Sequence, residues 1–225
     1  MHIYAFGSVC RGDVRQGSDI DLLALVDGYD SRFDPDIFSV YSYGRIVDLW
    51  SEGNPFAWHL FLESTLIFAS DGSDFLNSLN SPGDYTASLR DCEKFYGVFC
   101  EAYDSIASRP ASKVFELSTL FLSIRNIATC FSLGATDDPD FSRNSAQHLG
   151  SDSVPLPSAP YAILERARIL STRGKGPSIA DKEVDEVVAE LQTVKEWMEV
   201  LIAKAQNHER VQKSNGRATA NSRAS

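Results

Sequence analysis

Near its N-terminus the chain carries a glycine-serine pair, Gly7-Ser8, and after ten further residues an acidic triplet, Asp19-Ile20-Asp21. Apolar, strand-like runs stand on both sides, at residues 2–6 before the pair and 22–26 after the triplet. Because a strand points alternate side chains to one face, Asp19 and Asp21 are expected to project together, while Ile20 faces the opposite layer. The spacing therefore predicts two carboxylates held side by side near a glycine turn.

Two neighbouring carboxylates repel each other and require a proton or a cation. At about 4 Å and an effective dielectric of about 20, the repulsion between two unit charges is roughly 4 kcal/mol. Hard oxygen ligands suit Mg²⁺, which takes one or two carboxylates and completes its shell with water and phosphate oxygens. Gly7 lets the backbone approach a ligand closely, and a turn with free N–H groups forms a phosphate cradle. The pattern thus indicates a site for a metal-bound phosphate.

A third acid, Asp48, interrupts the apolar run Ile46–Trp50, which is read here as a strand. Its carboxylate would complete a metal site of the two-metal kind, in which ions clamp the attacking and leaving oxygens of an in-line displacement. Without a metal site, Asp19 would cap a helix or strand and Asp21 would be a solvated strand residue.

Together these residues resemble the DNA polymerase beta-like nucleotidyltransferase superfamily, and within it the minimal or bacterial-type nucleotidyltransferases. Three segments carry the resemblance in the order typical of that family: Phe6–Gly12, Ser18–Leu23 and Val47–Leu49. The resemblance implies the nucleotidyltransferase fold and two Mg²⁺ ions. It also implies the site residues, with Asp19, Asp21 and Asp48 as catalytic metal ligands and Gly7, Ser8, Arg11 and Ser18 as nucleotide-binding residues.

The activity implied by the resemblance is transfer of a nucleoside monophosphate, AMP from ATP, to a hydroxyl acceptor with release of pyrophosphate. Asp48 would activate the attacking hydroxyl through the second metal, and Arg11 would neutralise charge on the leaving pyrophosphate. The acceptor is expected to be a small molecule or a protein. The rival reading is a noncatalytic nucleotide- or protein-binding module of antitoxin type, which would keep these acids without turnover.

Composition narrows the partners. The 225 residues include 31 acids and 21 lysines and arginines, for a net charge of −10. This balance argues against nonspecific nucleic-acid binding, which needs cations to displace counterions from phosphates. We find neither a secretory leader nor an apolar run long enough to span a bilayer, and expect a cytoplasmic protein. The four cysteines form no zinc-type pattern and are expected to be reduced.

We expect an α+β chain: a small mixed-sheet nucleotidyltransferase domain at residues 1–80, an antiparallel helical bundle at 85–206 and a disordered tail at 207–225. Asn54-Pro55 predicts a helix start, and Pro82-Gly83 marks the boundary between the domains. Strands are expected at residues 2–6, 20–26, 38–43, 46–50 and 66–69. Apolar spacings of three and four predict helices at residues 89–103, 111–133, 159–171 and 179–206. A homodimer is left open.

The bundle resembles, more weakly, the helical domains that accompany nucleotidyltransferases, including the HEPN type. HEPN ribonucleases carry an Arg followed after four to six residues by His, whereas Arg125-Asn126 has no His at that spacing. A buried polar pair costs energy unless it is partnered. Arg125 is expected either to pair with Glu101 or Glu116 or to contact a substrate. Segment 141–160 is expected to be a mobile loop or a functional lid.

Overall fold

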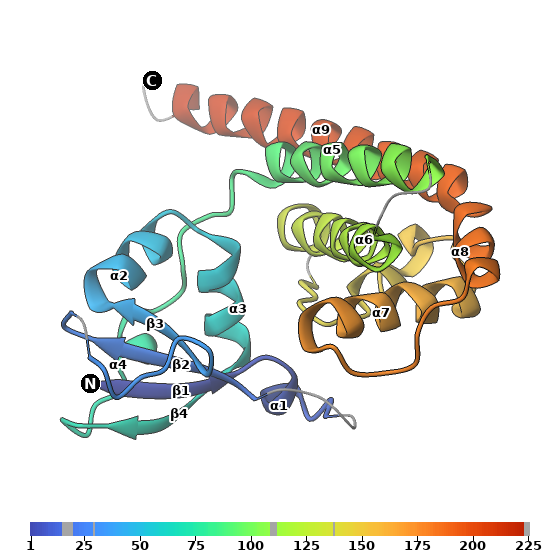
Figure 1. The fold of residues 1–225 in the computed structure, drawn as a ribbon. Coiled ribbons are helices and arrows are strands. Elements are labelled where there is room, and N and C mark those ends of the chain that lie inside the picture. Colours follow the sequence, from blue (N-terminus) through green and yellow to red (C-terminus); the bar gives the residue numbers. More distant parts are fainter. Residues whose placement is uncertain (15–19, 29, 109–111, 137, 223–225) are drawn as a thin grey trace. The chain divides into compact units, whose positions relative to one another are not determined.

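The computed structural model describes residues 1–14, 20–28, 30–108, 112–136 and 138–222, and within α9 it leaves the side chains at 212–213 and 215–222 undescribed. The chain forms two compact units, Met1–Thr86 and Ala87–Ser225. The described strands all lie in the first unit, and the second is helical (Figure 1). The α+β class expected from the sequence, a small mixed sheet followed by a helical region, is confirmed.

The sheet of the first unit has four strands in the order β3-β2-β1-β4. Strand β1 (His2–Phe6) is central and pairs antiparallel with β2 (Asp21–Val26) and with β4 (Ser64–Ala69). Strand β3 (Phe38–Ser42) pairs with β2 in parallel. In this register Phe6, the last residue of β1, lies opposite Asp21, the first residue of β2. The glycine turn and Asp21 therefore meet at one edge of the sheet.

Three helices complete this unit beside the short α1 (Ser8–Arg11): α2 (Tyr43–Ser51), α3 (Pro55–Glu63) and α4 (Phe75–Ser78). Asn54 caps α3 as predicted, because its side chain accepts the Phe56 N–H at 2.9 Å and Pro55 opens the helix. Side chains from β1, β2 and these helices share one core cluster, which includes Tyr4, Leu23 and Leu60.

The strand predicted at Ile46–Trp50 is wrong, since this run lies within α2. Its buried residues Ile46, Leu49 and Trp50 are spaced by three and one, which places them on one face of a helix. The Ser42 side chain accepts the Arg45 N–H at 3.2 Å and so caps the helix start. A short apolar run is compatible with a strand and with a buried helix, and here the Ser42 cap favours the helix.

Tyr4 ties the centre of the sheet to α4. Its hydroxyl donates to Asp74 Oδ1 at 3.0 Å and accepts the Leu76 N–H at 3.0 Å, and burial raises the pKa of the phenol. Tyr4→Phe leaves the Leu76 N–H without its partner, so we expect the first unit to lose about 1–3 kcal/mol of unfolding free energy.

The measurement for Tyr4→Phe is urea unfolding followed by tryptophan fluorescence in a Trp197→Phe background, because the two remaining tryptophans, Trp50 and Trp58, both lie in the first unit. Tyr41→Phe is the matched control: within the described residues the Tyr41 ring stacks on Phe56 and its hydroxyl has no hydrogen bond. Equal midpoints for the two variants would contradict the role of the Tyr4 hydroxyl.

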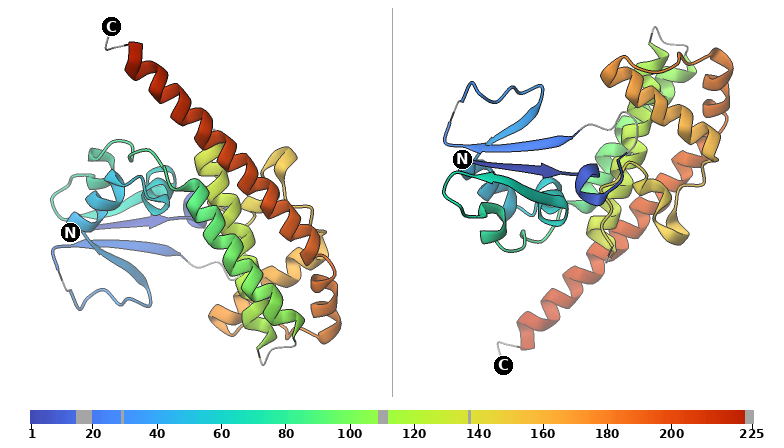
Figure 2. Two further views of the ribbon diagram at one scale, coloured as in Figure 1. Left: turned by 90° about the horizontal axis from the view of Figure 1, so that it is seen from above. Right: turned by 90° about the horizontal axis from the view of Figure 1, so that it is seen from below.

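The second unit contains five α-helices in its described part: α5 (Ser88–Ala107), α6 (Lys113–Ala135), α7 (Ser158–Arg173), α8 (Asp181–Val188) and α9 (Leu191–Ser222). Helix α6 packs against α5, α7 and α9, and α5 and α9 lie side by side (Figure 2). The single helix predicted at residues 179–206 is divided, because α8 ends at Val188 and α9 begins at Leu191.

Helix α6 is, by length and composition alone, the one helix in the described residues that is apolar enough to cross a membrane. This differs from the sequence-based prediction that no apolar run is long enough to span a bilayer. In the most apolar 18-residue stretch of this helix, 56% is buried inside the protein. Leu117, Leu120 and Ile124 of α6 are fully buried, which accounts for its composition as that of a core helix.

The disordered tail predicted from residue 207 differs from the structure, in which α9 continues to Ser222. An existing helix extends without a new nucleation step, and the Ala, Gln, Glu, Lys and Arg residues of this stretch are good helix formers. This end of α9 runs beyond the helices on which α9 packs (Figure 2).

Candidate functional site in the sheet unit

The glycine-serine turn directly follows the central strand. Gly7 has φ 71° and ψ −137°, a conformation that side chains disfavour, and Ser8 opens the one-turn helix α1. The Gly7 carbonyl accepts the N–H groups of Cys10 and Arg11 at 3.0 and 3.2 Å. The Gly7 N–H donates to the Glu63 carbonyl at 3.1 Å, at the junction of α3 and β4. The turn is therefore fixed to two elements of the sheet unit.

The carboxylate of Asp21 lies against this turn. A Cβ placed on Gly7 would stand 2.9 Å from Asp21 Oδ2 and 3.7 Å from His59 Nε2. Only glycine at position 7 leaves room for this carboxylate and adopts the positive φ. Asp21 as a residue is nevertheless exposed. The structure thus brings Gly7, Ser8 and Asp21 together at one edge of the sheet.

Arg11 ends α1 and forms an ion pair that the sequence did not reveal. Its Nη1 donates to Glu63 Oε2, and His59 Nε2 lies 3.0 Å from the same oxygen. All three side chains are largely covered, with 22% of Arg11, 12% of Glu63 and 16% of His59 exposed. The His59 ring also packs edge-on against Phe6. We define Arg11, His59 and Glu63 as the turn network.

The sequence alone did not place His59 or Glu63 at the candidate site. The signal that could have found them is their spacing of four on α3, which puts two ionisable side chains on one helix face. That face packs toward Phe6, at the end of β1 beside the turn.

The remaining predicted site residues divide into two groups. Ser18 and Asp19 lie outside the described residues. Asp48 is described and exposed, but α2 turns it away from the face that carries Ile46, Leu49 and Trp50 into the core. Its predicted place on a strand beside Asp21 is therefore not found. Among the described residues no three His, Cys, Asp or Glu side chains form a group suited to a metal ion.

An open hollow adjoins Asp21 on the side of β3. It is lined by Asp21, Leu22, Asp36, Phe38, Ser39 and neighbouring residues of the segment before β3. Space next to the carboxylate is what a ligand bound at this edge requires.

Comparison with known families agrees with this geometry. Residues 2–79 match the family model described as a nucleotidyltransferase domain. The matched segment runs from β1 through α4 and contains the turn, Asp21 and the turn network. The match supports the nucleotidyltransferase superfamily for the first unit, and with it nucleotidyl transfer as the general activity. No curated protein matches the chain.

The helical unit lies outside the matched segment. Arg125, which the sequence analysis noted as a polar residue in an apolar helix, has hydrogen-bond partners in the structure. Arg125 donates from Nε to the Ser142 carbonyl at 3.1 Å and from Nη2 to the Phe141 carbonyl at 2.7 Å. These partners are backbone carbonyls and not the predicted Glu101 or Glu116. The Glu116 carboxylate accepts a hydrogen bond from the Ser105 hydroxyl. Arg125 therefore fastens the segment after α6 to the body of the helix.

The segment predicted as a mobile loop or lid is bound to the helices at several points. It contains two short 3₁₀ turns, Ser145–Gln147 and Gly150–Asp152. His148 Nδ1 lies 2.7 Å from Asp140 Oδ2, and Trp197 Nε1 donates to the Asp152 carbonyl at 2.7 Å. Burial works to raise the pKa of Asp140, but hydrogen bonds from Ser142 and the contact with His148 outweigh it and leave this pKa below its usual value.

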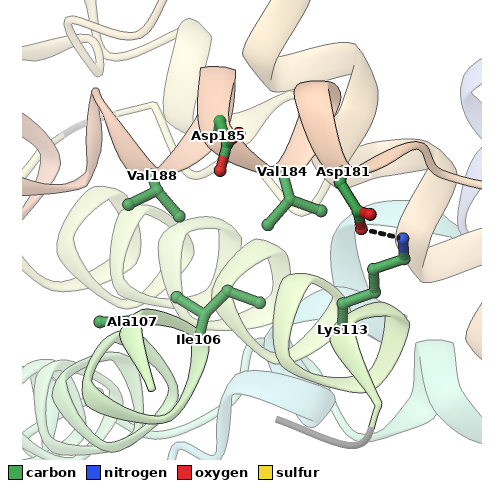
Figure 3. Close-up of a pocket in the computed structure, with 7 residues that line it drawn as sticks. All are labelled: Ile106, Ala107, Lys113, Asp181, Val184, Asp185 and Val188. Atoms are coloured by element: carbon green, nitrogen blue, oxygen red, sulfur yellow. Dashed lines mark hydrogen bonds and ion pairs between the residues drawn. The ribbon is translucent and has the colours of Figure 1, made fainter. Parts of the chain in front are cut away.

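A second hollow, of about 440 Å³, lies within the helical unit between the end of α5, the start of α6 and α8. Ile106, Val184 and Val188 point into it, and Lys113 Nζ meets Asp181 Oδ1 at 2.7 Å at its rim (Figure 3). Its described lining has one cation, Lys113, which is paired with Asp181, and it contains no glycine turn like the one at Gly7.

Proposed function

We propose that the sheet unit is a Mg²⁺-dependent nucleotidyltransferase that moves AMP from ATP to a hydroxyl acceptor. The observation that carries this proposal is the Asp21 carboxylate against the Gly7-Ser8 turn, in a segment that matches the nucleotidyltransferase domain. In the reaction a bond forms between the acceptor oxygen and the α-phosphorus. The bond from that phosphorus to pyrophosphate breaks, and the hydroxyl proton is released.

The chain's own residues have separate tasks in this proposal. Asp21 would hold Mg²⁺, since its exposed carboxylate beside an open hollow is a suitable oxygen ligand, and Asp19 is proposed as the second ligand from the family resemblance alone. The bound metal would neutralise phosphate charge and activate the hydroxyl. Ser8 would hold phosphate oxygens at the turn, and Gly7, whose own N–H donates to the Glu63 carbonyl, would let the backbone approach them closely. Ser18 is proposed as a further contact, and Arg11 would face the leaving pyrophosphate. The carboxylate of Asp48 is given no task, because α2 directs it away from the core face.

The acceptor is proposed to be a small molecule or a protein rather than a nucleic acid. The net charge of −10 opposes association with a polyanion. We also retain the cytoplasm as the proposed location, in line with the free cysteines.

The test is incubation of the purified chain with lysate and each nucleoside triphosphate labelled at the α-phosphate. We expect label from ATP to appear on one acceptor only when Mg²⁺ is present, and γ-labelled ATP to leave that acceptor unlabelled. Transfer of the γ-label would show phosphoryl rather than nucleotidyl transfer. Absence of any transfer, with nucleotide binding that ignores Mg²⁺, would support the noncatalytic binding module.

A further inference from the structure

Glu63 contacts both ends of the glycine-serine turn. Its carbonyl accepts the N–H of Gly7, just before α1, and its carboxylate accepts Arg11, the last residue of α1. Since α1 has only four residues, these two contacts fix the whole segment against the junction of α3 and β4.

His59 lies beside the same carboxylate. Its Nε2 lies 3.0 Å from Glu63 Oε2, the same oxygen that Arg11 contacts, and the two residues are four apart on α3. The His59 ring is held edge-on by Phe6 at a centroid distance of 5.5 Å. Glu63 thus accepts a hydrogen bond from Arg11 and has the His59 ring nitrogen at ion-pair distance, and only 12% of its side chain is exposed.

Arg11 keeps unused hydrogen-bonding capacity in this arrangement. Its Nε is buried and has no hydrogen-bond partner in the part of the chain that the structure describes. A buried donor without a partner is costly. Guanidinium groups bind phosphate oxygens through more than one N–H at once, and 22% of the Arg11 side chain is exposed.

We propose, on the basis of the transferase activity proposed above, that Glu63 is a positioning residue for the triphosphate. It holds Arg11 and the Gly7-Ser8 turn in the arrangement that receives the phosphates, and it acts through Arg11. Glu63 is itself an anion and does not bind the phosphates. Preorganisation of this kind lowers the entropy lost when the ligand binds.

The test is calorimetric titration of the full chain with Mg²⁺ and α,β-methylene-ATP, in which the bond to pyrophosphate cannot be cleaved. Glu63→Gln keeps the size of the side chain and removes its charge, and we expect affinity to fall about tenfold. Glu52→Gln is the matched control, because Glu52 forms an exposed pair with Arg45 at 3.6 Å in the same unit. Its affinity is expected to stay within about twofold of the parent chain.

A double-mutant cycle separates positioning from general structural support. If Glu63 acts through Arg11, Glu63→Gln should weaken binding by less than about twofold once Arg11→Ala is already present. Full additivity of the two losses would overturn the proposal, as would unchanged affinity in Glu63→Gln alone.

Unfolding midpoints of all variants are measured alongside. If Glu63→Gln does not fold, Glu63→Asp replaces it, which keeps the charge but shortens its reach to Arg11, and the same loss and the same cycle are expected. Failure of the parent chain to bind the analogue would overturn the transferase activity together with this role. Binding by the parent chain that Glu63 substitutions leave unchanged would overturn the role of Glu63 alone.

Discussion

Asp21→Asn is expected to lower the rate of nucleotide transfer by a hundredfold or more. The substitution keeps the shape of the side chain at the turn but removes the negative charge that holds the metal, and loss of one preorganised electrostatic contact typically costs about 10²–10³ in rate. The Asp21 carboxylate is exposed and lies at an edge of the sheet, so little loss of stability should accompany the loss of activity.

The measurement for Asp21→Asn is the rate of pyrophosphate release with saturating ATP and acceptor. Asp27→Asn is the control, because Asp27 is an exposed acid that follows the other end of the same strand. Transfer that persists in Asp21→Asn within about tenfold of the parent rate would exclude this carboxylate from the metal site.

Gly53→Ala is expected to destabilise the first unit by about 2–5 kcal/mol, from overpacking added to the cost of the left-handed conformation. Gly53 has φ 62°, and a Cβ there would stand 2.3 Å from the Asp84 carbonyl oxygen and 2.4 Å from that of Gly83. Those atoms belong to backbone that cannot easily move, because Trp58 Nε1 donates to the Gly83 carbonyl at 3.1 Å and the Gly83 N–H donates to Trp50 at 2.9 Å.

Gly44→Ala provides the matched comparison for Gly53→Ala. Gly44 lies in α2, and a Cβ there meets nothing within 4 Å. Alanine is the better helix former, so this variant should be neutral or more stable by up to about 1 kcal/mol. Both variants are measured by urea unfolding in the Trp197→Phe background, with the fluorescence of Trp50 and Trp58. A Gly53→Ala protein as stable as Gly44→Ala would show that the junction after α2 is looser than the structure indicates.

Much of the first unit follows from local signals in the sequence. The runs at residues 2–6 and 38–43 correspond to β1 and β3, and Asn54-Pro55 starts α3 as expected, because alternation and capping are local properties. The run around Asp48 failed since the same apolar residues also fit a helical spacing, and the deciding cap, Ser42, lies before the run.

The turn network could not be predicted in the same way. Arg11 and Glu63 are 52 positions apart, and their contact depends on how α3 closes against β1. Arg125 shows the same limit. Its need for partners followed from its place in an apolar helix, but carbonyl groups of the following segment meet that need, and sequence spacing gives no sign of them.

The most direct test of the central claim is calorimetry of ATP binding with and without Mg²⁺, comparing the parent chain with the Asp19→Ala, Asp21→Ala double variant. If these two acids hold the metal beside the Gly7-Ser8 turn, the parent chain should bind ATP in a metal-dependent manner and the double variant should lose that dependence. Equal ATP affinity in the presence of Mg²⁺ and of a chelator, or unchanged metal-dependent binding by the double variant, would contradict the claim.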